Sequence, residues 1–191
     1  MTNRTHISLP IDEKNVEIKA RIGSEQEFER RMQVACELTK SSGELLEQKD
    51  VFFNLLEEID GRRLKLRYLQ PPDVSQLIYY VRSNKTGPKL STFNIIDVED
   101  PVLLQEILKK SNGIKGILEK KRYLFLYGQT RIHMDKVINL GNFIEFEVCL
   151  RPDQTVEEGQ RIANELMKIF GIREEELMDG AYFDELLNIN V

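Results

Sequence analysis

Charged and apolar residues alternate along several short segments of this chain. In the segment Val16–Arg21, a single apolar residue, Ile18, separates Glu17 from Lys19. Side chains two residues apart on a β-strand point to the same face of its sheet. Each such segment therefore predicts a strand with one charged face and one apolar face. The same spacing recurs between Lys65 and Arg67, along Arg131, His133 and Asp135, and between Glu145 and Glu147.

The composition predicts one globular domain over residues 1–191. The chain has 41% hydrophobic and 31% charged residues, which is typical of a folded domain and not of a disordered segment. Its net charge of −5 disfavours a general nucleic-acid binder, because such proteins need a basic surface. Cys36 and Cys149 are too few for a disulfide framework, so a reducing compartment is expected.

No leader and no membrane segment are expected. The polar stretch Met1–Asn15 lacks the apolar core of a secretory signal. No apolar run approaches the roughly 18 residues that a membrane-spanning helix needs. We therefore expect a cytoplasmic protein without membrane or nucleic-acid partners. Its oligomeric state, monomer or homodimer, stays open.

Hydrophobic periodicity and turn signals divide the chain into many short strands and a few helices. Asp60-Gly61 is a strong hairpin signal, and Ser24 with Glu27 three residues later forms a helix-capping pattern. These signals favour an α+β, mainly antiparallel barrel or sandwich with helices outside. Strands are expected over residues 15–22, 48–56, 63–69, 76–83, 89–98, 117–127, 130–137 and 143–150. Helices are expected over residues 24–40, 101–111, 155–170 and 173–178.

The apolar faces of these strands indicate which way the charged faces point. The segments around Leu66, Ile132 and Phe146 are too apolar on one face to lie in water. The expected helices carry apolar stripes that must also be buried, so packing them on the outer face of a curled sheet satisfies both. The charged faces then line the interior. Alternation alone also fits ordinary half-exposed strands, and both arrangements remain open at this point.

An interior arrangement would contain more positive than negative charge. Buried charges are costly unless they are paired, so the excess predicts an anionic ligand. The repulsion between Glu145 and Glu147 predicts a bound cation, and carboxylates with phosphate oxygens suit Mg²⁺ or Mn²⁺. The inward candidates are the cations Lys19, Arg21, Lys65, Arg67, Arg82, Lys120, Arg122 and Arg131 and the carboxylates Glu17, Asp135, Glu145 and Glu147.

The segments, in their order along nearly the whole chain, resemble the CYTH superfamily, also called triphosphate tunnel metalloenzymes. This group includes class IV adenylate cyclases, to which the chain looks closer, and thiamine triphosphatases. The resemblance implies an eight-stranded antiparallel barrel that closes into a charged tunnel with helices outside. The segments that carry it include Asn15–Lys19, Gly61–Arg67, Leu77–Arg82, Gly87–Ser91, Glu119–Arg122, Arg131–Val137, Leu140–Val148 and Ala181–Leu187.

The resemblance also implies roles for individual residues. The expected triphosphate-binding residues are Lys19, Lys65, Arg67, Arg82, Lys120 and Arg122, to which the inward Arg131 is added. The expected ligands of Mg²⁺ or Mn²⁺ are Glu17, Asp135, Glu145 and Glu147. The expected catalytic residues are Lys19, Arg67 and Asp135. His133 is interpreted either as a proton relay or as a hydrogen-bonded residue of the tunnel wall.

One position departs from the family pattern. The first glutamate of the family's ExExK opening is Asn15 here, followed by Glu17 and Lys19. Asparagine is neutral and a weaker Mg²⁺ ligand than a carboxylate, so one metal site is expected to be weakened or lost. Glu13 has the same parity as Asn15 but is expected to precede the strand in solvent.

Three functions remain as hypotheses. The first is metal-dependent hydrolysis of inorganic triphosphate, a nucleoside triphosphate or thiamine triphosphate. The second is cyclisation of ATP to cyclic AMP and pyrophosphate. The third is binding of a polyphosphate or nucleotide without turnover. A P-loop is excluded as the phosphate-binding element, since its glycine-rich motif is missing from the sequence.

Overall fold

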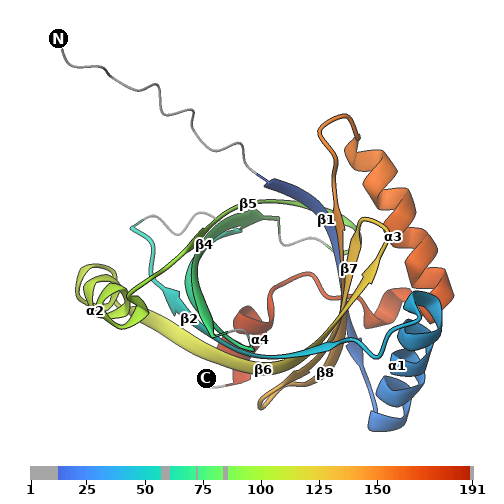
Figure 1. Cartoon of the computed structure of the whole chain (residues 1–191), viewed down its shortest axis with the longest axis horizontal. Coiled ribbons are helices and arrows are strands. Elements are labelled where there is room, and N and C mark those ends of the chain that lie inside the picture. Colours follow the sequence, from blue (N-terminus) through green and yellow to red (C-terminus); the bar gives the residue numbers. More distant parts are fainter. Residues whose placement is uncertain (1–12, 57–60, 72, 84–85, 190–191) are drawn as a thin grey trace.

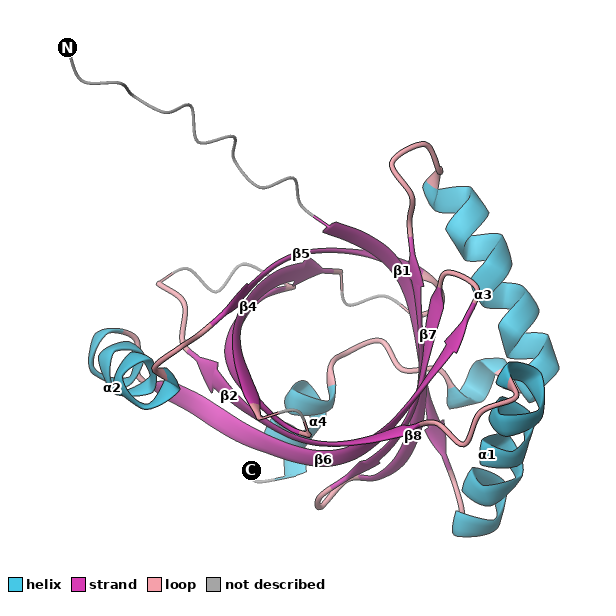
Figure 2. Cartoon of the chain, viewed as in Figure 1, coloured by secondary structure: helices cyan, strands magenta, loops and turns pink. Residues whose placement is uncertain are grey.

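A closed antiparallel barrel forms the body of the protein (Figures 1 and 2). This computed structural model describes residues 13–56, 61–71, 73–83 and 86–189. The strands are β1 (Glu13–Ile22), β2 (Glu44–Phe53), β3 (Arg62–Gln70), β4 (Val74–Arg82), β5 (Lys89–Asp97), β6 (Ile114–Tyr127), β7 (Thr130–Val137) and β8 (Gly141–Cys149). The helices are α1 (Glu25–Thr39), α2 (Pro101–Ser111), α3 (Val156–Phe170) and α4 (Tyr182–Ile189).

The strand order around the barrel is β1-β5-β4-β3-β2-β6-β7-β8, and β8 pairs with β1 to close the ring. The structure thus confirms the expected barrel and not a sandwich. In the closing pair, Glu17 lies opposite Glu147 and Lys19 lies opposite Glu145. Because alternate residues point inward on every strand, this register brings charged side chains from β1 and β8 together inside the barrel.

Several elements differ from their predicted bounds. β2 begins at Glu44 and not at residue 48, because Glu44 pairs with Leu124 of the long strand β6. The expected helix at residues 173–178 is only a short 3₁₀ turn, Glu174–Glu176. The expected start of α1 is confirmed, since the backbone N–H of Glu27 donates to Oγ of Ser24 at 3.2 Å.

Two helices cover one side of the barrel and a third covers the opposite side. α1 and α3 lie beside β1, β6, β7 and β8, and α2 lies across the ring from them (Figure 1). Phe146 on β8 packs against Phe170 of α3, with ring centroids 5.2 Å apart. The outer faces of the strands are therefore the apolar faces. Val16, Ile18, Ile132, Met134, Ile144, Phe146 and Val148 are all buried under α1 and α3.

The C-terminal helix α4 packs across one end of the barrel. Phe183 of α4 stacks on Phe52 of β2, with ring centroids 4.3 Å apart. A Cβ atom at Gly116 of β6 would lie 2.5 Å from Cε2 of Phe183, so only glycine lets this ring approach the strand. We call this end of the barrel, where β1 reaches Ile22, the α4 end, and the opposite end, near Asn15, the Asn15 end.

The remaining expectations concern the termini and the turns. None of the described helices is both long and apolar enough to cross a bilayer. The expectation of no secretory signal rests on Met1–Asn15, of which residues 1–12 lie outside the described residues, as does Asp60 of the predicted Asp60-Gly61 turn. Gly61 itself has φ +86°, a conformation that glycine adopts without strain.

Candidate active site

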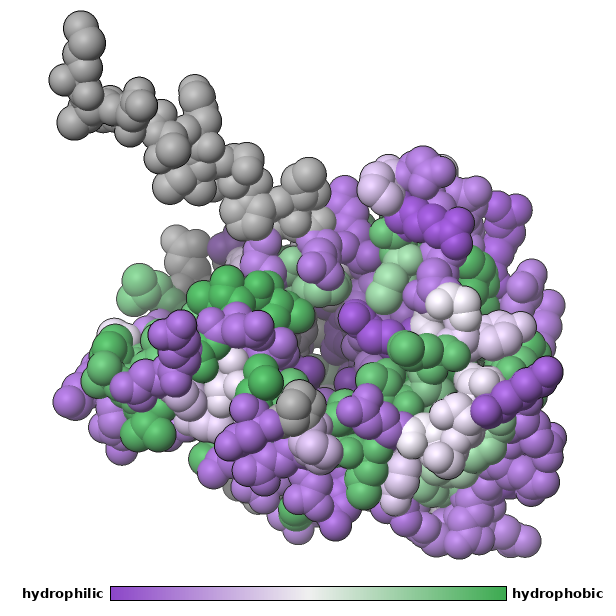
Figure 3. Space-filling model, viewed as in Figure 1, coloured by the Kyte–Doolittle hydropathy of each residue, from purple (hydrophilic) through white to green (hydrophobic). Residues whose placement is uncertain are grey.

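A cavity of about 310 Å³ runs through the interior of the barrel, and every strand contributes to its wall. The space-filling view shows a hollow near the middle of the molecule (Figure 3). Its lining combines charged, amide and apolar side chains with the aromatic rings of Phe52, Tyr80 and Phe93. Its basic lining residues are Lys19, Lys65, Arg67, Arg82, Lys120, Arg122 and Arg131, and its acidic ones are Glu17, Asp50, Glu145 and Glu147.

Asp50 on β2 pairs with two cations of the neighbouring strand β3. Its carboxylate accepts a hydrogen bond from Lys65 Nζ at 2.9 Å and two from the Arg67 guanidinium at 2.7 and 2.8 Å. Burial alone would raise the pKa of Asp50, but Arg67 and Lys65 hold it well below its usual range. Burial and the neighbouring Arg67 lower the pKa of Lys65 from 10.5 to about 8. This cluster therefore fixes two cations at the cavity wall.

A second acidic residue, Asp135 on β7, holds two cations of β6. It accepts hydrogen bonds from Arg122 at 2.7 and 2.6 Å and from Lys120 Nζ at 3.1 Å. Burial would raise the pKa of Asp135, but Arg122 and Lys120 lower it below its usual range. Burial and Arg122 lower the pKa of Lys120 from 10.5 to about 7. Asp135 is completely buried behind these cations and does not line the cavity.

On the β1 wall, Glu17 and Asn15 differ in their partners. Glu17 accepts a hydrogen bond from Arg82 of β4 at 2.6 Å. Asn15 is only 2% exposed and lines the cavity, but no described residue donates a hydrogen bond to its Oδ1. Glu13 is exposed, as expected, but it is the first residue of β1 and does not precede the strand. The cavity thus presents an unpartnered amide oxygen where the family pattern has a carboxylate.

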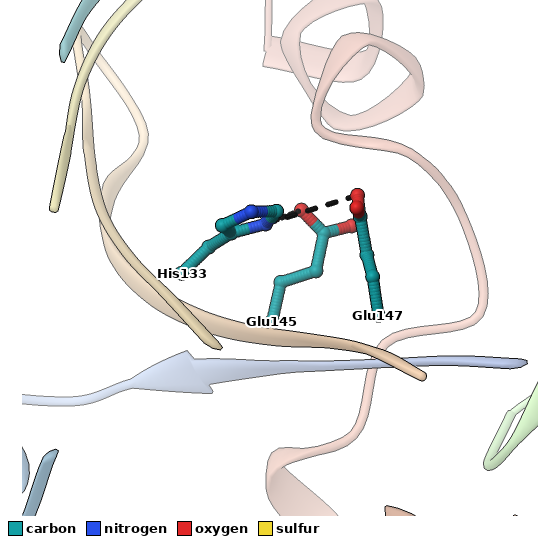
Figure 4. A group of neighbouring side chains, drawn as sticks. All are labelled: His133, Glu145 and Glu147. Atoms are coloured by element: carbon teal, nitrogen blue, oxygen red, sulfur yellow. Dashed lines mark ion pairs between the residues drawn. The ribbon is translucent and has the colours of Figure 1, made fainter. Parts of the chain in front are cut away.

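His133, Glu145 and Glu147 converge at one point of the β7–β8 wall (Figure 4). Their ligand atoms all lie within 4.8 Å of one another. His133 Nδ1 is 3.5 Å from Glu145 Oε2 and 3.7 Å from Glu147 Oε1. This Nδ1 atom is buried and forms no hydrogen bond with the described residues. Burial lowers the pKa of His133, which keeps its imidazole neutral and able to act as a ligand. Carboxylate oxygens with one imidazole suit a divalent metal ion, so this donor set fits the expected Mg²⁺ or Mn²⁺.

Cations also contact the two glutamates of this group. Lys19 Nζ lies 2.8 Å from Glu145 Oε1, and Arg122 donates to Glu145 Oε2 at 2.7 Å. Arg131 Nε donates to Glu147 Oε2 at 2.9 Å. Burial would raise the pKa of Glu145, but Lys19 holds it well below its usual range. Both carboxylates are therefore ionised and close to expected triphosphate-binding residues.

At the α4 end, aromatic and backbone groups meet the cations. Lys19 Nζ lies 3.9 Å from the ring centroid of Tyr182, and Lys120 Nζ lies 5.1 Å from it. Lys89 donates to the backbone oxygens of Met178 and Asp179. Tyr182 is only 4% exposed. The interior is therefore bounded at this end by α4 and the segment before it.

The structure gathers most of the expected residues, with two exceptions. Arg21 has the inward parity but does not line the cavity, because it lies at the α4 end and binds the backbone oxygen of Leu140 and the side chain of Glu185. Asp135 lies behind Lys120 and Arg122. Asp50 was not among the sequence-based candidates, although it is two residues after Gln48 on an expected strand. Gln48, Asp50 and Phe52 lie two residues apart, and this spacing on a strand could have indicated that Asp50 points inward with them.

Comparisons with known proteins agree with this geometry. The CYTH domain family model matches residues 13–182. Protein PH1012 from Pyrococcus horikoshii has a similar structure, with a TM-score of 0.75, 21% identity and coverage of 89% of this chain and 98% of that one. A protein from Vibrio parahaemolyticus, described as a proposed adenylate cyclase, gives a TM-score of 0.69 and 19% identity over 91% of this chain and 97% of that one.

A further solved structure has the same fold. HpAC1 from Hippeastrum, described as a proposed adenylyl cyclase with a dominant triphosphatase activity, gives a TM-score of 0.62 and 16% identity over 91% of this chain and 95% of that one. No protein with curated annotation matches the sequence. At these identities the solved structures establish the fold alone, whereas the family model establishes the relationship.

Proposed function

Because the chain belongs to the CYTH domain family, we propose that it hydrolyses the terminal phosphoanhydride of a triphosphate with Mg²⁺ or Mn²⁺. The observation that carries this proposal is the charge of the cavity. Seven basic and four acidic residues line it, and with the buried carboxylate of Asp135, which pairs with Lys120 and Arg122, a formal excess of two positive charges remains. Such an excess is costly in a largely enclosed space, and a triphosphate would neutralise it.

The basic residues bind the triphosphate in this proposal. Arginine binds phosphate through two hydrogen bonds, while lysine acts as a point charge. Lys19 and Arg67 stabilise the charge that develops on the phosphoryl oxygens during attack by water. The binding residues are Lys19, Lys65, Arg67, Arg82, Lys120, Arg122 and Arg131.

Carboxylates that already hold cations act as positioning residues. Asp135 orients Arg122 and Lys120, and Asp50 orients Arg67 and Lys65. Because these contacts are made before any ligand binds, the cations need little reorganisation to bind a triphosphate. The proposed role of Asp135 therefore changes from metal ligand to the support of two binding residues.

Glu145, Glu147 and His133 would hold the metal ion. A divalent cation there supplies charge neutralisation at phosphate oxygens and lowers the pKa of a bound water. Glu17 is engaged by Arg82 and is assigned to orienting that arginine. Glu145 has a second task, since its Oε1 atom contacts Lys19 and so links the metal ligands to the phosphate-binding set.

Release of orthophosphate tests the proposal. Tripolyphosphate, ATP and thiamine triphosphate are each incubated with Mg²⁺, with Mn²⁺ and with EDTA. We expect metal-dependent release, reduced at least about tenfold in Glu147→Gln. Glu165→Gln, at an exposed position of α3, serves as the matched control. No release from any substrate, or release that persists in EDTA, would contradict the proposal, and cyclic AMP from ATP would favour the cyclase alternative.

A further inference from the structure

The lining of the cavity changes in character between its two ends. On β1, the inward residues run from Asn15 through Glu17 to Lys19 towards the α4 end. On the opposite wall, β2 runs in the same order from Leu46 through Gln48 to Asp50. In both strands an uncharged residue thus precedes the charged part of the cavity. We call the part of the wall formed by these residues, at the Asn15 end, the uncharged zone; Arg131 and Glu147 line the cavity at the same end on β7 and β8.

Two buried amides mark the boundary of this zone. Asn15 is 2% exposed and Gln48 is 5% exposed, and both line the cavity. Asn15 Oδ1 and Gln48 Oε1 accept no hydrogen bond from any residue in the described ranges. β1 and β2 lie four places apart in a ring of eight strands, so the two amides face the cavity from opposite walls. Leaving a buried acceptor unsatisfied is costly, which points to a ligand with hydrogen-bond donors.

Apolar side chains surround these amides towards the Asn15 end. Leu69 follows Arg67 on β3, and Leu124 follows Arg122 on β6, each two residues nearer to this end. Ile95 is 41% exposed, so the apolar lining reaches the outer surface. The apolar residues of this zone are Leu46, Leu69, Ile78, Phe93, Ile95 and Leu124. Such walls favour a group with apolar faces.

From this arrangement we infer that the substrate is an organic triphosphate whose non-phosphate part lies between Asn15 and Gln48. This inference rests on the proposed function and narrows its substrate class. The part has apolar faces and hydrogen-bond donors, a chemistry that a nucleoside and thiamine both provide. Ionised tripolyphosphate offers only acceptors and negative charge, so it satisfies neither amide oxygen. Asn15 is then a specificity residue and not a weakened metal ligand.

The two possible roles of Asn15 make different predictions. Asn15 lies on β1 next to the acidic group of His133, Glu145 and Glu147, and its partner on β8 is Cys149 rather than one of those glutamates. Its strand neighbours in the register are Ser91 and Cys149. A metal-binding role predicts that loss of Asn15 impairs every substrate. A specificity role predicts that only substrates with an organic group are impaired.

The test compares substrates within each variant. Catalytic efficiency, kcat/KM, is measured with Mn²⁺ for ATP, thiamine triphosphate and tripolyphosphate. The variants are Asn15→Leu and Gln48→Met, and Asn164→Leu on the exposed face of α3 is the control. We expect the efficiency for the preferred organic substrate, divided by that for tripolyphosphate, to fall about threefold to tenfold in each cavity variant. This ratio does not depend on the fraction of protein that is correctly folded.

The outcomes separate this inference from the proposed function. If the wild type hydrolyses none of the three compounds, the proposed function fails. If it hydrolyses them but prefers tripolyphosphate, or if both variants leave the ratio unchanged, the inference is wrong while the proposed function stands. If the variants lower kcat/KM for ATP, the bound organic group is a nucleoside; if they lower it for thiamine triphosphate, the group is thiamine.

Discussion

Arg122 and Asp135 form a two-point hydrogen bond inside the barrel, from Nε to Oδ1 at 2.7 Å and from Nη2 to Oδ2 at 2.6 Å. The two residues lie opposite each other on β6 and β7. Nη2 of Arg122 also donates to Glu145 at 2.7 Å. One arginine therefore joins a completely buried carboxylate to a proposed metal ligand.

Asp135→Asn should destabilise the protein strongly. The substitution leaves Arg122 and Lys120 without their buried counter-charge, and breaking a buried pair in this way costs about 3–5 kcal/mol. Urea unfolding should show this loss in the free energy of unfolding. Asp153→Asn, at an exposed position, should change it by less than about 0.5 kcal/mol. A loss below about 1 kcal/mol in Asp135→Asn would show that the pair has no such role.

Asp50→Asn should increase the thermal stabilisation that the protein gains when it binds a polyanion. In the wild type, the Asp50 carboxylate orients Lys65 and Arg67 but also neutralises part of their positive charge, and we expect the second effect on phosphate affinity to be the larger. Without that carboxylate, the two cations gain more from a bound triphosphate. Thermal melting should show a lower Tm for the unliganded variant and a larger Tm increase on addition of tripolyphosphate than in the wild type. An equal or smaller increase would be inconsistent with direct binding of phosphate by these two cations.

Affinity for tripolyphosphate should fall as the pH rises past the pKa of Lys65. Burial and Arg67 lower that pKa to about 8. A bound polyanion stabilises the protonated ammonium, so binding takes up a proton once the free lysine is neutral. The contribution of Lys65 to this dependence then approaches about tenfold per pH unit above this pKa. Calorimetry at several pH values and in two buffers measures both the affinity and the proton uptake.

Lys65→Arg provides the control for this dependence. Arginine stays charged throughout the range, whereas the titration of tripolyphosphate itself is the same for both proteins. The difference between the two proteins therefore isolates Lys65. Identical pH profiles would mean that Lys65 does not contribute its charge to binding.

His133→Ala should weaken metal binding and change metal preference. Imidazole is a better ligand for transition metals than for Mg²⁺, so the loss should be greater for Mn²⁺. We expect the dissociation constant for Mn²⁺ to rise at least about tenfold, measured by electron paramagnetic resonance of the free ion. The exposed Glu165→Gln variant should bind Mn²⁺ like the wild type. Unchanged Mn²⁺ affinity in His133→Ala would exclude His133 as a ligand.

Alternation of charge predicted the inward faces well but not the position of each residue along the barrel. Glu17, Lys19, Arg67 and Glu145 all line the cavity, as their parity requires. Arg21 has the same parity as Lys19, yet it lies where the barrel ends. Parity gives the face of a residue, whereas its depth depends on strand register and barrel ends, which no local pattern specifies.

The proposed metal-binding group of His133, Glu145 and Glu147 shows the same limit. His133 and Asp135 are both inward on β7, and their spacing gives no reason to prefer one as a ligand. The structure pairs Asp135 with Arg122 across the β6–β7 register and leaves His133 beside Glu145. Asp50 was missed because the neighbouring inward residues on its strand, Gln48 and Phe52, are uncharged, so the strand shows no alternation of charge there.

Hydrolysis of ATP in ¹⁸O-labelled water with Mn²⁺, followed by ³¹P nuclear magnetic resonance, tests the proposed reaction most directly. Attack of water on the terminal phosphoryl group predicts ADP and orthophosphate, with one ¹⁸O atom in the orthophosphate and none in ADP. Pyrophosphate with cyclic AMP would contradict it, as would no release of orthophosphate from ATP, thiamine triphosphate or tripolyphosphate under conditions in which the protein binds the substrate and Mn²⁺.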